Sequence, residues 1–434
     1  MFRNLAGYTE MLLRLKPVLY ARIRFKVNNT LCIKCKGKGL CGRPRCPILE
    51  KFKSLQSIAP AISGDSVFGA SPPAIFVGSY GYPRVSAGPL IPPFAKENEA
   101  SAFEEPASWA NMQIEDIISL RSHMVRANTN FHVKDAHSKE NPLLVKAQEL
   151  ALSRKPVDTE AWFFKPPKQE LKFDAVLTPM GPSGLVKNFE LTENPKVPKK
   201  VDYLVYDTDA LAKDAVLELF KGDVSAEHIT RLLSIGLLGR ARKIVPTRWS
   251  ITAVDEMAGK ELADRIKDFP WTSEIQLFSG THFGNHFEVL ILPRAYSFEL
   301  IEVWLPKTVW SGESSWIGED SEGYEGKKGY SSLAGGYYAA RLPALEYLKN
   351  IKRQASVFVL REITPDYWAP LGVWVVREGM RKAFQNPPKK FNSLEAAVSD
   401  LAGRISTPKV EWVQQAKLLS DFRFQTTLDF FFKK

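Results

Sequence analysis

The sequence has few cysteines and histidines and no long hydrophobic run. It contains 4 cysteines and 6 histidines in 434 residues, and every cysteine lies between Cys32 and Cys46. Disulfides that stabilise a large secreted protein are not clustered in this way, so we expect a reducing compartment. No stretch approaches the roughly 20 apolar residues that a membrane-spanning helix needs. Glu10, Arg14 and Lys16 interrupt the amino-terminal segment, which argues against a signal peptide and predicts a cytoplasmic protein.

Lysine and arginine outnumber aspartate and glutamate, and the sequence contains no ATP-binding loop. The net charge is +11 and the isoelectric point is about 9.3. Such a surplus favours an anionic partner such as nucleic acid, although a merely basic surface would give the same number. The absence of a G-x-x-x-x-G-K-[ST] loop argues against an ATP-driven motor.

Runs of strands and runs of helices predict an α+β fold, with mixed or antiparallel sheets and flanking helices. Residues 71–93 are expected to form a hairpin, and 201–220 a strand, a turn and a helix. Three β-rich runs between 272 and 306 predict an antiparallel meander. The stretch 372–384 fits a strand or a helix equally well.

Composition divides the chain into four expected parts. A helix and a four-cysteine module occupy residues 1–60, and a first α+β region follows over 61–200. The main α+β region covers 201–420, and a flexible tail covers 421–434.

The cysteines form a predicted metal site in the stretch LCIKCKGKGLCGRPRCP. Cys32 and Cys35 make a C-x2-C pair, and Cys41 and Cys46 complete a set of four thiolates suited to tetrahedral zinc. An iron–sulfur cluster is the alternative, since it also takes four thiolates. Four protein ligands leave no open position, so the zinc is expected to be structural.

The chain ends in QTTLDFFFKK. Gln425, Leu428, Phe431 and Phe432 fit the pattern Q-x-x-(aliphatic)-x-x-aromatic-aromatic. One turn of 3₁₀ helix would gather the apolar side chains into a plug with the glutamine amide beside it. This resembles the PIP box, the peptide that docks replication and repair proteins on the PCNA sliding clamp.

Several longer stretches carry a family resemblance. They are FVGSYGYPRVSAGPLIPP, GRARKIVPTRWSITAVDE, GNHFEVLILP, GGYYAARLPALEYL and LREITPDYWAPLGVWVVREGMRKA. Together with the cysteine cluster and the terminal peptide, they resemble the archaeal Nre family over nearly the whole length. The resemblance implies a role in DNA damage repair, with PCNA and DNA as partners and a nucleoid-associated location. It also suggests a DNA glycosylase that removes oxidised guanine.

The segment 239–256 is the predicted DNA-binding stretch. Arg240, Arg242 and Arg248 could hold phosphates while Trp249 stacks on a base. For a glycosylase with lyase activity, Lys243 would attack the sugar and Asp255 would support charge in the transition state. A flipped base needs aromatic walls, which could come from the set Trp249, Tyr367, Trp368 and Trp374.

Two alternatives remain open. A metal-dependent nuclease could use Asp207 and Asp209 at a strand end, and the possible further ligands are His282, His286 and Glu288. A non-catalytic adaptor would bind DNA and deliver partners to the clamp without forming a product.

Overall fold

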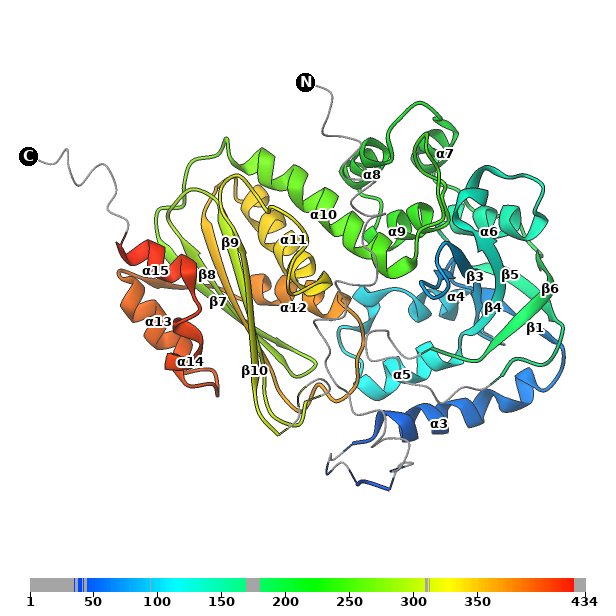
Figure 1. The fold of residues 1–434 in the computed structure, drawn as a ribbon, viewed down its shortest axis with the longest axis horizontal. Coiled ribbons are helices and arrows are strands. Elements are labelled where there is room, and N and C mark those ends of the chain that lie inside the picture. Colours follow the sequence, from blue (N-terminus) through cyan, green and yellow to red (C-terminus); the bar gives the residue numbers. More distant parts are fainter. Residues whose placement is uncertain are drawn as a thin grey trace, which may run out of the picture.

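The structure, a computed structural model, contains two β-sheets with helices packed against them (Figure 1). It describes residues 35, 38–40, 42, 45–93, 95–168, 180–308, 311 and 313–424. In this part of the chain each sheet has six strands, and each contains one parallel pair among antiparallel pairs. Strands and helices do not alternate regularly, which confirms the predicted α+β class with mixed sheets.

The first sheet has the strand order β1-β5-β6-β4-β3-β2. Its strands are β1 (Ser66–Ser71), β2 (Ile75–Val77), β3 (Arg84–Ile91), β4 (Val125–His132), β5 (Val157–Phe163) and β6 (Ser183–Leu191). The predicted hairpin is confirmed, because β2 and β3 pair antiparallel. Along β5, alternate residues are buried, so one side of this strand faces the core.

Seven helices of the described chain accompany the first sheet. They are α3 (Pro47–Ile58), α4 (Glu97–Ala100), α5 (Ile114–His123), α6 (Pro142–Leu152), α7 (Lys199–Tyr206), α8 (Ala212–Lys221) and α9 (Ala226–Ser234). Four short 3₁₀ helices connect them: η2 (Ala59–Ile62), η3 (Ser101–Phe103), η4 (Pro106–Trp109) and η5 (Val133–His137). One hydrophobic core joins the sheet to α6–α9 and reaches Val254 in the next helix.

The second sheet has the order β10-β9-β11-β8-β7-β12. Its strands are β7 (Ile275–His282), β8 (Asn285–Leu292), β9 (Ser297–Trp304), β10 (Trp316–Glu322), β11 (Ser356–Ile363) and β12 (Lys389–Phe391). All residues of β11 are buried, as expected for a central strand with both faces covered.

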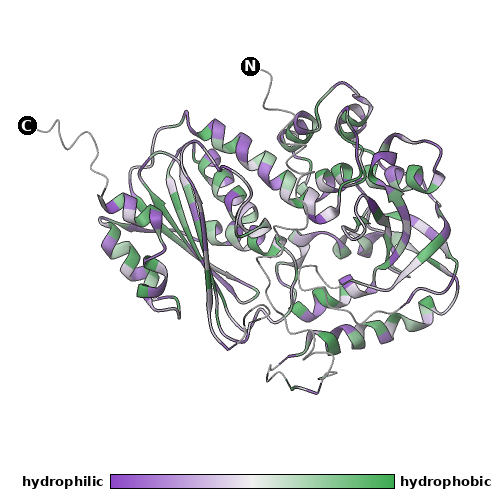
Figure 2. Ribbon diagram, in the orientation of Figure 1, coloured by the Kyte–Doolittle hydropathy of each residue, from purple (hydrophilic) through white to green (hydrophobic). Residues whose placement is uncertain are grey.

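Helices cover both faces of this sheet (Figure 1). One face packs on α10 (Thr247–Ile266), α11 (Gly335–Asn350) and α12 (Trp374–Gln385). The other packs on α13 (Leu394–Ala402), α14 (Lys409–Val413) and α15 (Lys417–Phe424). Most of these helices mix hydrophilic and hydrophobic residues along their length (Figure 2), as expected where one side faces a core, whereas α11 is buried on all sides over residues 336–345. Since α10 contributes to both large cores, it links the two sheets.

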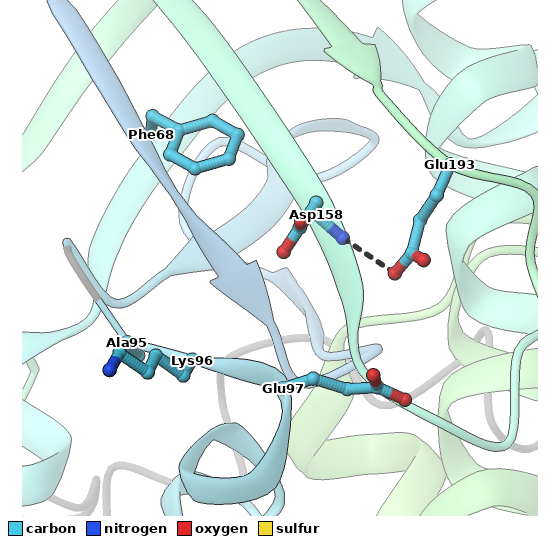
Figure 3. A pocket seen from close by; sticks show the side chains of 6 residues that line it. All are labelled: Phe68, Ala95, Lys96, Glu97, Asp158 and Glu193. Atoms are coloured by element: carbon cyan, nitrogen blue, oxygen red, sulfur yellow. Dashed lines mark hydrogen bonds between the residues drawn. The ribbon is translucent and has the colours of Figure 1, made fainter.

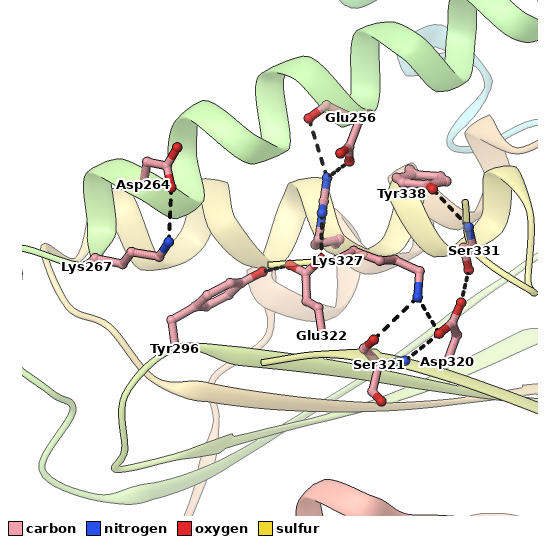
Figure 4. A network of polar contacts seen from close by, with 11 residues as sticks. Glu256, Asp264, Lys267, Tyr296, Asp320, Ser321, Glu322, Lys327, Ser331 and Tyr338 are labelled. Atoms are coloured by element: carbon pink, nitrogen blue, oxygen red, sulfur yellow. Dashed lines mark hydrogen bonds and ion pairs between the residues drawn. The ribbon is translucent and has the colours of Figure 1, made fainter. Parts of the chain in front are cut away.

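A buried polar network ties α10 and α11 to the edge of the second sheet (Figure 4). Arg341 of α11 donates to Glu322 of β10 at 2.7 Å and also pairs with Glu256 of α10. The Tyr296 hydroxyl donates to the second oxygen of Glu322 at 2.6 Å. The Glu322 carboxylate therefore accepts from α11 and from the connection between β8 and β9.

Two predictions about individual elements are wrong. The start of 201–220 is not a strand but part of helix α7, where Val201, Leu204 and Val205 are buried at helical spacing. The predicted meander is interrupted, because β11 inserts between β8 and β9 and runs parallel to β9. Only β7 and β8 form the expected hairpin.

The ambiguous stretch 372–384 contains helix α12. Gln425, Leu428, Phe431 and Phe432 lie outside the described residues, as do Cys32 and Cys41. The flexible tail and the four expected domain limits therefore stay predictions. Every helix in the described part of the chain is too short or too polar to span a lipid bilayer.

Candidate nucleic-acid interface

The predicted DNA-binding segment leads into α10 and is fixed at several points. The amide of Arg240 donates to Ala210 at 2.9 Å, and the amide of Ile244 donates to Val133 at 2.9 Å. Farther along, the Thr247 hydroxyl oxygen accepts from the amide of Val77 at 2.9 Å. The segment is thus anchored to the α7–α8 connection, to η5 and to β2.

A tyrosine-rich turn between β2 and β3 packs against the same helix start. The ring of Tyr82 lies 5.2 Å from the ring of Trp249, tilted by 53°. Burial raises the pKa of the Tyr82 phenol, so this side chain stays neutral. Two stretches of the sequence that are more than 160 residues apart therefore form one aromatic layer. We call Tyr80, Tyr82, Arg84, Arg240 and Trp249 the aromatic–basic surface.

The cations of this segment differ in their surroundings. Arg84 and Arg240 are exposed, and within the described chain neither forms an ion pair. Arg242 is different, because its guanidinium donates to the carbonyls of Val205 and Gly239, and burial lowers its pKa. Arg248 is half-buried in the first turn of α10. Arg84 and Arg240 are therefore the cations best placed to meet an anion from solvent.

The helix dipoles add to this positive potential. Thr252 of α10 lies near Gly335 of α11, and Glu256 lies near Arg341 farther along both helices. The two helices therefore run parallel, with their amino-terminal ends on the same side. Neither N-cap residue, Pro246 or Ala334, accepts a hydrogen bond with its side chain. The start of α10 carries partial positive charge, whereas the Glu302 carboxylate lies against Gly336 in the first turn of α11.

The proposed catalytic pair is not brought together. Asp255 is fully buried, and its two oxygens accept from Arg377 of α12 at 2.7 and 2.9 Å. Burial raises the Asp255 pKa, and the neighbouring Arg377 acts against that rise. Lys243 lies in the segment before α10, and no ion pair joins it to Asp255, although the structure describes both residues. The arrangement gives Asp255 a structural role between two helices.

The other predicted aromatic walls belong to a closed core. Tyr367, Trp368 and Trp374 are all buried in a cluster with η4 and α5. The rings of Trp374 and Trp109 lie 4.8 Å apart. Trp249 is not a member of this cluster, so the four aromatic residues do not line a common pocket.

The residues of the nuclease alternative do not converge either. Asp207 follows helix α7 rather than a strand, and its carboxylate accepts from the amides of Asp209 and Ala210 at 3.0 and 3.1 Å. It forms a turn between α7 and α8. Across the β7–β8 hairpin, His286 pairs with Thr281 rather than with His282. The two histidines therefore point to opposite faces of the sheet.

The histidines have different local partners. His286 contacts the buried Glu288 at 2.7 Å. Burial, with a smaller contribution from Lys382, lowers the pKa of His282 to about 4. Among the described residues, no three histidine, cysteine or acidic side chains come close enough together to hold a metal ion.

A shallow hollow on the first sheet has the opposite charge. Its lining consists of Phe68, Ala95, Lys96, Glu97, Asp158 and Glu193 (Figure 3). Burial, with the nearby carboxylates of Glu193 and Glu97, raises the pKa of Asp158. Three carboxylates against one lysine would repel phosphates, so this hollow is a poor site for DNA.

Part of the cysteine loop is described. Cys35 is buried, and its sulfur accepts from the amide of Leu40 at 3.2 Å. Arg45 pairs with Glu115 of α5 at 2.8 Å and lies over the Trp368 ring at 5.9 Å. The loop therefore contacts the aromatic core at the end of β11. A hydrogen bond from a backbone amide to sulfur stabilises the thiolate form of a cysteine.

The sequence reasoning missed the contribution of the tyrosine turn. Tyr80 is 97% exposed and Arg84 is also exposed, yet the local pattern of this stretch predicts only a hairpin. Two tyrosines and an arginine around a glycine–proline turn were the available signal. Its partner helix could not be identified without the fold.

Comparison with known proteins gives one consistent family. The archaeal Nre amino-terminal model matches residues 40–311, and the carboxy-terminal model matches residues 322–431. The chain is 43% identical to DNA repair protein NreA of Archaeoglobus fulgidus over 91% of this chain and 99% of that protein. It is 36% identical to DNA repair protein NreB of the same organism over 92% and 99%.

A more distant relative agrees with this result. DNA repair protein NreA of Haloferax volcanii is 34% identical over 82% of this chain and 87% of its own. No solved structure matches the chain. The family models and the relatives match regions of the chain that include both sheets. The chain therefore belongs to the archaeal Nre family.

Proposed function

We propose that this protein is a DNA repair factor that holds DNA on the aromatic–basic surface and is recruited to the PCNA clamp by its terminal peptide. The relatives named above are DNA repair proteins. The observation that carries the proposal is the contact between the rings of Tyr82 and Trp249, because each of the two segments that meet there also carries an exposed arginine, Arg84 in one and Arg240 in the other. The role predicts a nucleoid-associated location.

The chemistry of this surface fits a nucleic acid. Guanidinium groups bind phosphates, and aromatic rings stack on bases. The start of α10, which carries Trp249, adds positive potential without needing further side chains. The acidic hollow offers the opposite potential, so charge alone would direct DNA to the aromatic–basic surface.

The clamp interaction is supported by the pattern of the terminal residues. Gln425, Leu428, Phe431 and Phe432 supply an amide head and three apolar anchors. They follow helix α15, which packs on the second sheet. The aromatic–basic surface lies at the start of α10, which links the first sheet to the second. Binding the clamp and binding DNA would therefore use different parts of the protein.

Zinc is the metal we propose for the four cysteines. Cys32, Cys35, Cys41 and Cys46 would hold it, and the buried, amide-bonded sulfur of Cys35 fits a thiolate ligand. A four-thiolate zinc site stabilises a loop and has no position for a substrate. Through Arg45 and Trp368 the loop would support the core beside β11.

DNA binding is tested by fluorescence anisotropy with a labelled 20-base-pair duplex at several salt concentrations. Replacing Arg84 and Arg240 together by Ala should weaken binding about tenfold at low salt and lower the slope of log K against log salt by about 2. Lys349→Ala with Arg353→Ala is the matched control, because both cations are exposed at the far end of α11. Equal effects of the two double variants would refute the assignment of the surface.

The glycosylase hypothesis stays a prediction about the same bound DNA. It depends on Lys243, because Asp255 is already engaged by Arg377. Borohydride trapping on DNA that carries 8-oxoguanine would detect a covalent lysine intermediate. If no adduct is trapped and the strand stays intact after alkali treatment, the glycosylase hypothesis is wrong and the proposed role is limited to DNA binding and recruitment.

A further inference from the structure

Tyr80 stands at the tip of the β2–β3 turn with 97% of its side chain exposed. We propose that Tyr80 stacks on an unpaired base, so that the aromatic–basic surface selects single-stranded or locally unpaired DNA over intact duplex. The inference rests on the proposed function, because it specifies which form of DNA that surface takes. A ring so exposed buries almost no area in the folded chain, so packing does not explain its presence.

The turn holds the tyrosine on a defined backbone. The amide of Gly78 donates to Ser86 at 2.8 Å, and the amide of Arg84 donates to Gly81 at 3.0 Å. Gly81 has a φ of +81°, and an added Cβ would lie 2.9 Å from the carbonyl oxygen of Arg84. Only glycine fits easily there. With the backbone already fixed, little conformational entropy is lost when the ring meets a ligand.

Contacts on both sides of Tyr80 place the turn over the start of α10. Before it, the amide of Val77 donates to Thr247; after it, Tyr82 packs on Trp249. The turn that carries Tyr80 is therefore held against α10 by its neighbouring residues. Arg84 is the first residue of β3, directly after the turn, and Arg240 lies in the segment that enters α10.

Exposed cations near an exposed aromatic ring are the features that proteins use to bind single-stranded DNA. Proteins that bind single-stranded DNA pair cations along the backbone with rings on which bases stack. In an intact duplex the faces of internal bases are covered by their neighbours, so a ring at the tip of a turn has no base face to meet. An unpaired base, or one beside a lesion, offers that face at lower cost.

The test compares binding of the full-length protein to fluorescein-labelled (dT)20 and to a blunt 20-base-pair duplex. Tyr80→Ala should weaken binding to the single strand about tenfold and change duplex binding less than twofold. Tyr80→Trp should retain binding to the single strand. Trp271→Ala is the control for losing an exposed ring, because Trp271 is 50% exposed and follows the other end of α10. It should change neither affinity.

A base analogue gives a second readout. With 2-aminopurine in the single strand, wild-type protein should alter its fluorescence by stacking, and Tyr80→Ala should abolish that change. Unaltered single-strand affinity in Tyr80→Ala, or an equal loss for both DNAs, would overturn the inference. The proposed function would still stand if Arg84→Ala with Arg240→Ala weakened binding. Failure of the wild-type protein to bind either DNA would overturn both.

Discussion

The buried arginine between α10, α11 and β10 allows a sharp prediction of stability. Only 3% of the Arg341 side chain and 1% of the Glu322 side chain are exposed. Burial acts to lower the Arg341 pKa, but the carboxylates of Glu322 and Glu256 more than offset it, so the pKa lies above its ordinary value. Arg341→Ala would leave the Glu322 carboxylate buried with the Tyr296 hydroxyl as its remaining partner.

Removing one partner of a buried ion pair destabilises a protein by about 3 to 5 kcal/mol. Arg381 provides a matched control. It also pairs with two carboxylates, those of Glu346 and Glu378, but 35% of its side chain is exposed. For such an exposed pair the loss should be about 1 kcal/mol or less.

Urea unfolding followed by tryptophan fluorescence measures both variants. Arg341→Ala should lower the unfolding midpoint far more than Arg381→Ala. Combining Arg341→Met with Glu322→Gln should recover part of the loss, because the most deeply buried partner of Arg341 then carries no charge; Glu256, whose side chain is 25% exposed, can reach solvent. Equal midpoints for the two alanine variants would show that the buried network does not hold the helices to the sheet.

Three further predictions concern the tail, the metal and a buried acid. Phe431→Ala with Phe432→Ala should abolish PCNA binding in calorimetry while thermal unfolding stays unchanged; unaltered clamp affinity would exclude the terminal peptide as the anchor. Metal analysis should find about one zinc per chain, whereas iron with a brown colour would identify a cluster. Burial raises the pKa of Glu299 from its ordinary value of 4.5 to about 7, so the folded state binds this proton more tightly than the unfolded chain does. The resulting stabilisation is full below about pH 4.5 and is lost as pH rises through 7, by up to about 3 kcal/mol. Glu299→Gln should flatten that part of the stability curve, and an identical pH dependence in both proteins would count against it.

Local patterns in the sequence identified many elements but not their partners. The apolar residues of PLLVKAQELAL have the spacing of a helix, and this stretch forms α6, which the Asn141 side chain caps. By contrast, VDYLVY has the β-branched and aromatic composition of a strand. Its valines and leucine nevertheless bury as a helical face against α8 and the first core. Tertiary packing therefore outweighs intrinsic strand preference in α7.

Pairing between strands that are distant in the chain could not be predicted from local sequence patterns. The insertion of β11 between β8 and β9 joins residues 59 to 78 positions apart, and no local signal specifies it. Likewise, α15 begins where Glu299 of β9 accepts the amides of Lys417 and Leu418. The first amides of α15 thus donate to a carboxylate on a strand that is distant in the sequence.

In the candidate site, too, local patterns in the sequence identified residues but not their partners. The basic segment with Trp249 was evident from composition, and its exposed Arg240 lies as a DNA contact would require. Which of its cations are engaged within the protein was not evident, because Arg242 bonds to the carbonyl of Val205 across a loop. The contribution of Tyr80 and Tyr82 emerged only when the fold placed their turn on α10.

Hydrogen exchange of the full-length protein with and without saturating single-stranded DNA would locate the DNA-binding surface. If DNA lies on the aromatic–basic surface, it should slow exchange in peptides covering residues 78–84 and 239–250 and leave exchange in β12 and α13 unchanged. Protection confined to other surfaces, with unchanged exchange in the tyrosine turn and at the start of α10, would contradict it.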